Sequence, residues 1–192
     1  LCGDLRVVHS SPTRRSPDRP GVNKPAGTGS SVGVGKAKNR EALLAALTNA
    51  SKYDSKILVE EFINGREVEV AVLGNAGPAA SVCGEIDAGA DFYDYEAKYI
   101  SDCADLYIPA RISEEASEQV RETAVRVYQA MGCRGLSRVD FFVTREGQEV
   151  VFNEINTIPG FTSISMYPKL FEASGIPYSE LLDDLLALAL DD

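Results

Sequence analysis

The chain has 192 residues with a formal net charge of −10 at pH 7, and 44% of its residues are hydrophobic. An acidic protein is a poor partner for the phosphate backbone of nucleic acids, and no apolar run reaches the roughly 20 residues of a transmembrane helix. Four scattered cysteines without a C-x-x-C pair indicate reduced thiols rather than a zinc site. We therefore expect a cytoplasmic protein without nucleic-acid or membrane partners.

The first 22 residues are rich in proline, serine and arginine and show no periodicity. Such a segment buries too little apolar surface to offset its ordering entropy, so we expect a disordered leader. Residues 24–36 predict a Gly/Ser-rich turn followed by a strand. Asn39 then caps a helix, and residues 57–62 and 67–73 predict strands around an Asn-Gly turn.

The second half predicts a strand at 82–86, a polar, tyrosine-rich loop at 87–104 and a strand at 106–108. Ser113 caps a helix that stops at Gly132. The apolar face of that helix is Val120, Ala124, Val127 and Met131. A last helix begins near Ser179 and is expected to cover a sheet. The fold class is α+β, with mainly antiparallel strands backed by helices.

Two short strands joined by a polar turn over residues 144–148 are the most informative part of the chain. Side chains two residues apart point to the same face of a strand. Arg138 and Asp140 therefore share one face of the first strand, and Glu154 and Asn156 share one face of the second.

Folding about that turn brings Asp140 to the level of Asn153 and Glu154, with a guanidinium beside them. Oxygen ligands that leave coordination positions open suit Mg²⁺ shared with substrate phosphates. The alternative interpretation is an amphipathic hairpin whose polar face is solvated and performs no chemistry.

Three further segments carry residues suited to a nucleotide. Residues 24–33 place a lysine before glycines and serines that could cradle a phosphate, although such a loop is often only a turn. Residues 59–67 combine carboxylates and apolar side chains for a ribose and a purine; the alternative is an acidic strand-turn-strand. Residues 92–99 hold three tyrosines and a lysine in a loop that could close over a ligand or simply pack.

In chain order these segments read Lys-Pro-x-x-x-Gly-Ser-Ser-x-Gly, Glu-Glu-Phe-x-x-Gly-x-Glu, Tyr-Asp-Tyr-Glu-Ala-Lys-Tyr, Ser-Arg-Val-Asp-Phe-Phe and Asn-Glu-Ile-Asn-Thr-Ile-Pro-Gly-Phe-Thr. Together they resemble the D-alanine–D-alanine ligase family of ATP-grasp enzymes over nearly all of residues 24–190. The resemblance implies an ATP-grasp fold that lacks the family's N-terminal domain. We expect a leader at 1–22, a partial central lobe at 23–66 and the C-terminal lobe at 67–192.

The resemblance also implies the activity. Family members ligate two D-alanines for peptidoglycan precursor synthesis through a D-alanyl phosphate, with ATP as co-substrate and two Mg²⁺ ions, or Mn²⁺ in their place. Members form homodimers, and we expect part of the dimer surface to be missing here. The implied metal ligands are Asp140, Glu154 and Asn156. The implied ATP-binding residues are Lys24, Ser31, Glu60, Phe62, Ile63, Glu67, Lys98 and Asn153.

The implied catalytic residues are Arg138, Gly160, Ser30 and Tyr99. The first two would stabilise the oxyanion of the tetrahedral intermediate, and the last two belong to a hydrogen-bonded trio that orders the site. Ser163, Ser165 and Met166 are expected at the second D-alanine. The tyrosine at position 99 favours D-alanine over D-lactate as second substrate, whereas D-serine stays open.

The chain also departs from the family. From the resemblance we expect the N-terminal domain that binds the first D-alanine, and most of the central lobe, to be absent. Arg-Pro-Gly-Val-Asn replaces the apolar strand expected before Lys24, so residues 1–22 read as foreign sequence. We therefore expect an incomplete fragment with weak or no ligation activity. The alternatives are another ATP-grasp carboxylate–amine ligase or a catalytically inactive nucleotide-binding fragment.

Overall fold

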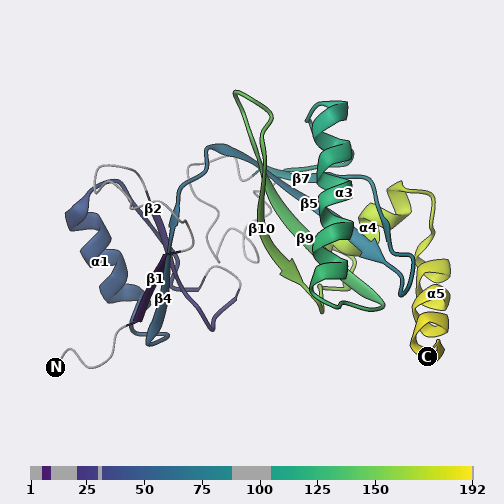
Figure 1. Ribbon diagram of the computed structural model, residues 1–192, viewed down its shortest axis with the longest axis horizontal. Coiled ribbons are helices and arrows are strands. Elements are labelled where there is room, and N and C mark those ends of the chain that lie inside the picture. Colours follow the sequence, from purple (N-terminus) through teal and green to yellow (C-terminus); the bar gives the residue numbers. More distant parts are fainter. Residues whose placement is uncertain (1–5, 10–20, 30–31, 88–104, 192) are drawn as a thin grey trace. The chain divides into compact units, whose positions relative to one another are not determined.

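The computed structural model describes residues 6–9, 21–29, 32–87 and 105–191 (Figure 1). The chain divides into two compact units, each with its own sheet. The first contains the described residues up to Ile63, and the second comprises Asn64–Asp87 and Asp105–Asp192.

The first unit is a four-stranded sheet in the order β1-β4-β2-β3, with one helix, α1. Its elements are β1 (Arg6–His9), β2 (Gly21–Pro25), β3 (Gly35–Ala37), α1 (Arg40–Ala50) and β4 (Lys56–Glu61). Asn39 caps α1 as the sequence predicted, because its Oδ1 accepts a hydrogen bond from the Ala42 amide at 2.9 Å. The alternating burial of β2 leaves Gly21, Asn23 and Pro25 inside and Val22 and Lys24 on the other face.

The expectation that residues 1–22 lack regular structure is wrong for two parts of that segment. Arg6–His9 forms β1, which pairs in parallel with β4, and β2 begins at Gly21. A strand at the edge of a sheet needs only main-chain hydrogen bonds to its neighbour. A four-residue strand is too short to show a periodicity within a segment rich in proline, serine and arginine.

The second unit is a sheet in the order β10-β9-β5-β7-β8, with the short β6 paired to β5. Its strands are β5 (Gly65–Leu73), β6 (Ala79–Ala80), β7 (Gly84–Asp87), β8 (Asp105–Tyr107), β9 (Leu136–Thr144) and β10 (Val150–Asn156). Every pairing in this sheet is antiparallel. The prediction of an α+β fold with mainly antiparallel strands is confirmed.

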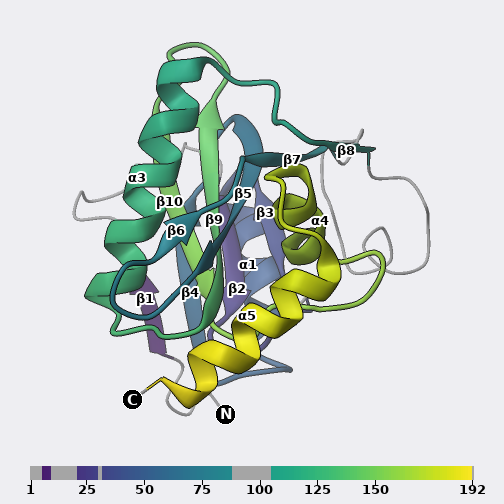
Figure 2. The same cartoon turned by 90° about the vertical axis from the view of Figure 1, so that its right-hand side faces the viewer.

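Helices cover both faces of this second sheet (Figure 2). On one face α3 (Glu114–Ala130) packs on the valines of β5 and the inner residues of β9. On the other face α4 (Met166–Ala173) and α5 (Tyr178–Leu190) pack on Ala71 and Leu73 of β5. The expected cover by the last helix is therefore confirmed.

Two details of the helices differ from the sequence prediction. Met131 is 65% exposed, and Tyr128 takes the expected place on the buried face, where its hydroxyl donates to the carbonyl of Gly74 at 2.8 Å. Helix α4 was not predicted, because Pro168 interrupts its pattern. The proline lies in the first turn, where the missing N–H would have no helical partner.

A buried ion network joins β7 to the chain after β8. Glu85 is 1% exposed, and its carboxylate accepts hydrogen bonds from Arg66 Nη1 at 2.6 Å and Arg111 Nη2 at 2.7 Å. Burial alone would raise the pKa of Glu85, but the hydrogen bonds from Arg111 and Arg66 outweigh it and hold that pKa below its ordinary value. Glu85 is paired with Val68, so it lies on the α3 face of the sheet.

The cysteines and the hydropathy of the helices were also considered in the sequence. Cys83 and Cys133 are free thiols, whereas Cys2 and Cys103 lie outside the described residues. Within the part of the chain that the structure describes, no helix combines the length and the hydropathy needed to cross a bilayer.

Candidate functional site

The polar residues of the β9–β10 hairpin share one face of the second sheet. In β9, Val139, Phe141 and Val143 are buried against α3, so Arg138 and Asp140 face the opposite side. The strand register pairs Asp140 with Glu154 and Arg138 with Asn156. Residues paired directly across an antiparallel ladder lie on the same face, so the predicted convergence is present.

A β-bulge at Asn153 determines which side chain meets Asp140. Phe152 pairs with Phe141, and the next pair is Glu154 with Asp140, so Asn153 is the extra residue. In a regular ladder Asn153 itself would stand opposite Asp140. The bulge therefore places a carboxylate, rather than an amide, beside the carboxylate of β9.

Arg138 lies in the middle of this cluster. Its Nε donates to Asp140 Oδ1 and its Nη2 to Asp140 Oδ2, both at 2.7 Å. The same Nε is 3.2 Å from Oε2 of Glu69 on the neighbouring strand β5. Burial alone would lower the pKa of Arg138, but Asp140, Glu69 and Glu154 raise it, so the guanidinium carries a fixed positive charge.

The donor set suits a hard divalent cation. Asp140 and Glu154 are cross-strand neighbours, and Asn156 Nδ2 donates to Asp140 Oδ2 at 3.0 Å, so the amide group adjoins the same carboxylate. Among the described residues, no group of three His, Cys, Asp or Glu side chains could hold a metal by itself. Two carboxylates and an amide leave several coordination positions for phosphate oxygens and water, as Mg²⁺ prefers.

The loop after β10 carries the residues expected at the second substrate. Ser165 Oγ accepts a hydrogen bond from the Thr162 amide at 2.9 Å, and the Ser165 amide donates to the Thr162 carbonyl at 3.0 Å. A Cβ at Gly160 would lie 2.8 Å from Ser165 Oγ, so a side chain at this position would displace the Ser165 hydroxyl. Ser163 is exposed, whereas Met166 is 6% exposed and its side chain belongs to the core under α4.

The first unit carries a separate polar face. Asn23, Ile57 and Val59 are buried, so the neighbouring Lys24 and Glu60 point to the opposite face. Lys24 Nζ forms an ion pair with Glu60 Oε2 at 3.0 Å.

Phe62 and Ile63 follow β4 directly and are half-buried. Lys36 Nζ lies 3.5 Å from the centroid of the Phe62 ring, a cation–π contact. The glycine-rich loop is tied to this unit by Asp54, whose Oδ2 accepts from the Gly27 amide at 2.6 Å.

Sequence reasoning missed two charged residues on these faces. Glu69 follows Glu67 by two positions on β5, so strand periodicity alone could have placed both on one face. Lys36 gave no such signal, because its contact with Phe62 depends on the pairing of β3 with β2. Ser30, Ser31, Lys98 and Tyr99 lie outside the described residues.

The chain is similar to known proteins of one family. A family model described as "D-ala D-ala ligase C-terminus" matches residues 15–187. A D-alanine–D-alanine ligase of Ruminiclostridium cellulolyticum is 59% identical over 170 residues, covering 88% of this chain and 45% of the relative. One of Chlorobium phaeovibrioides is 57% identical over 168 residues, covering 88% and 46%.

The chain also matches solved structures of D-alanine ligases. The D-alanine–D-alanine ligase of Coxiella burnetii matches with a TM-score of 0.77 and 41% identity, over 89% of this chain and 45% of that one. VanG, a D-Ala:D-Ser ligase of Enterococcus faecalis, matches with a TM-score of 0.80 and 44% identity, over 88% and 49%. The chain thus spans about half the length of the relatives it matches.

The match of the two sheets to these solved structures shows that the chain has an ATP-grasp fold. More narrowly, the chain belongs to the D-alanine–D-alanine ligase family and matches the C-terminal part of its members. The match begins at residue 15, so the relationship extends into the segment 1–22, for which the sequence predicted none.

Proposed function

We propose that this chain serves the ATP-dependent ligation of two D-alanines to D-alanyl-D-alanine, a cytoplasmic step of peptidoglycan precursor synthesis. The observation that carries the proposal is the cluster of Arg138, Asp140, Glu154 and Asn156 on one face of the second sheet. It combines oxygen ligands for the divalent cation that phosphoryl transfer uses with a fixed positive charge for the oxyanion of the second step.

The reaction has two steps. A D-alanine carboxylate oxygen takes the γ-phosphoryl group of ATP and ADP leaves, so that an acyl phosphate forms. The amine of a second D-alanine then attacks the acyl carbon, phosphate departs, and the amine loses a proton. Mg²⁺, held by Asp140, Glu154 and Asn156, would neutralise charge on the phosphates. Two ions, or Mn²⁺ instead, follow from the family resemblance.

Arg138 would stabilise the negative charge that develops on the carbonyl oxygen during the second step. A preorganised cation in a site that excludes water is worth far more than one in solvent. The Gly160 amide would contribute a second donor, as the family resemblance implies.

Nucleotide binding would use the remaining polar residues. Lys24 and Lys98 would hold phosphates as point charges, and Ser31 and Asn153 would add polar contacts. Glu60, Phe62 and Ile63 would line the adenine pocket, and Glu67 would hold the ribose. These assignments rest on the family resemblance, and the ion pair of Lys24 with Glu60 supports their common face.

For the second substrate we favour D-alanine. Ser30 and Tyr99 would order the site, and Ser163 and Ser165 would contact the substrate directly. Since the Met166 side chain is buried, its contribution would come from the backbone. The two curated relatives described above, at 57% and 59% identity, are both D-alanine–D-alanine ligases, which supports this choice.

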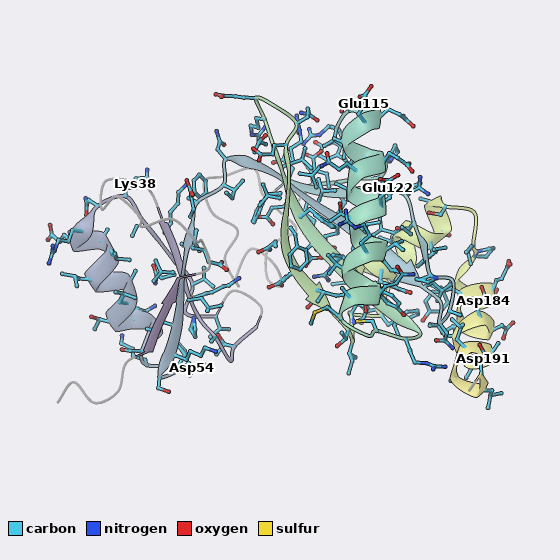
Figure 3. The ribbon with its side chains drawn as sticks, in the orientation of Figure 1. Lys38, Asp54, Glu115, Glu122, Asp184 and Asp191 are labelled. Atoms are coloured by element: carbon cyan, nitrogen blue, oxygen red, sulfur yellow. The ribbon has the colours of Figure 1, made fainter. Side chains whose placement is uncertain are left out.

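Isothermal titration of the chain with ADP, with and without Mg²⁺, tests the proposal. We expect binding that depends on Mg²⁺ and weakens at least about tenfold in Glu154→Gln. Glu122→Gln changes an exposed glutamate of α3 (Figure 3) and is the matched control, expected to bind as the parent chain does. Equal binding by Glu154→Gln and the parent would contradict the metal assignment.

Ligation is measured separately, by mass spectrometry of the dipeptide formed from ATP with D-alanine alone or with added D-serine. We predict weak or no turnover by these residues alone. Formation of mixed D-alanyl-D-serine in excess of D-alanyl-D-alanine would contradict the choice of second substrate.

A further inference from the structure

Glu69 is a buried carboxylate that the mechanism above does not use. The residue is 8% exposed and lies in the middle of β5. The strand register pairs Glu69 with Asp140, and Asp140 with Glu154. Three carboxylates therefore form a row across three adjacent strands. Burying a charged group is costly unless it is compensated, so this position calls for a physical explanation.

The compensation comes from Arg138. Oε2 of Glu69 lies 3.2 Å from Nε of Arg138, whose Nε and Nη2 also donate to both oxygens of Asp140. The guanidinium is thus flanked by carboxylates from two strands, one of which is an implied metal ligand and one of which is not.

Asp140 has two competing tasks. Both of its oxygens accept hydrogen bonds from Arg138, yet a divalent cation would draw on the same lone pairs. When a cation weakens that hold, an arginine with a single anionic partner would be left buried and poorly compensated. Glu69 removes this conflict as a second anion, because it holds the Arg138 guanidinium in place when Asp140 binds the metal.

The formal charges of the cluster agree with these separate roles for Glu69 and Asp140. The carboxylates of Glu69, Asp140 and Glu154 set against one guanidinium leave two formal negative charges, which balance one of the two proposed divalent cations. Without the charge of Glu69 the cluster would hold only one.

We propose that Glu69 is a positioning residue for Arg138, fixing its guanidinium so that Asp140 is released to bind the divalent cation. The inference rests on the proposed function, since it takes Asp140 as a metal ligand. It adds a residue that touches neither metal nor substrate and acts through Arg138.

Mn²⁺ is the probe, because its free form is counted directly by electron paramagnetic resonance. The full 192-residue chain is titrated in the presence of ADP. Glu69→Gln keeps the size of the side chain and removes its charge, and we expect Mn²⁺ affinity to fall about tenfold. Glu85→Gln removes a more deeply buried, arginine-paired carboxylate on the opposite face and should leave Mn²⁺ affinity within about twofold of the parent.

A background without the arginine separates the positioning of Arg138 from a direct effect of the Glu69 charge on the cation. In Arg138→Gln, removal of the Glu69 charge should change Mn²⁺ affinity much less than in the parent, because the residue it acts through is absent. An equal loss in both backgrounds, or no loss in Glu69→Gln itself, would overturn the inference. Thermal unfolding of each variant confirms that the titrated protein is folded.

Failure of the proposed function gives a different pattern. If Asp140→Asn binds Mn²⁺ as tightly as the parent chain, the metal site itself is wrong and the inference falls with it. If Asp140→Asn loses Mn²⁺ while Glu69→Gln does not, only the role of Glu69 is refuted.

Discussion

Asn23 should destabilise the first unit, and replacing it with leucine should stabilise that unit. The side chain is fully buried, and neither its Nδ2 nor its Oδ1 has a hydrogen-bond partner among the described residues. It lies in β2 between Gly35 of β3 and Val59 of β4. An amide in such surroundings has lost its hydration without replacement.

The size of the effect follows from that loss. A buried polar group left unsatisfied costs about 1–3 kcal/mol, and leucine has the same branched shape without the polar atoms. Imperfect packing of the larger methyl groups would return up to about 1 kcal/mol. We expect a net gain of about 1–2 kcal/mol, which for a unit of this size is a rise of about 5–15 °C in its melting temperature.

Scanning calorimetry with hydrogen exchange read on peptides from α1 and β4 assigns the change to the first unit. Asn49→Leu makes the same substitution at an exposed position of α1 and should alter stability by less than about 0.5 kcal/mol. A lower melting temperature for Asn23→Leu, with Asn49→Leu unchanged, would mean that the Asn23 amide is satisfied in solution and would refute the reasoning.

Three other predictions concern polar groups outside the site. Glu85→Gln should cost about 3 kcal/mol in urea unfolding, because it leaves both of its arginines without their buried anion. Backbone hydrogen bonds lower the pKa of Asp54, so its hydrogen bond from the Gly27 amide should be fully formed above the ordinary aspartate pKa and be lost as the pH falls through a lower midpoint. The chemical shift of the Gly27 amide in NMR reports this loss, and Asp54→Asn should abolish the titration. Tyr128→Phe should lower stability by about 1 kcal/mol in the same urea assay through loss of its hydrogen bond to the Gly74 carbonyl, and an unchanged midpoint would contradict that assignment.

The site on the second sheet could be predicted largely because strand periodicity is strict. Arg138 and Asp140 alternate with Val139 and Phe141, and burial of the latter pair fixes the direction of the former. The same rule applied to β5 would have selected Glu69. What periodicity cannot supply is the order of strands, so the contact of Glu69 with Arg138 became visible only in the fold.

The unpredicted elements have a common cause. Pairing of β1 with β4 joins residues about fifty positions apart, and α4 depends on burial of Met166 and Leu170 against the sheet. Both elements owe their stability to tertiary neighbours rather than to local pattern, and local propensity is a weak guide in that situation. Asn39 and Ser113, whose caps act within one helical turn, were by contrast predictable from sequence alone.

The bulge at Asn153 shows how one local irregularity sets the chemistry of the site. A regular hairpin would place the amide of Asn153 opposite Asp140 and turn Glu154 toward the α3 face, where Val139 and Phe141 are buried. A carboxylate directed there would be desolvated without a partner. The extra residue therefore serves folding and function together, because the register that keeps Glu154 out of the core is the one that sets it beside Asp140.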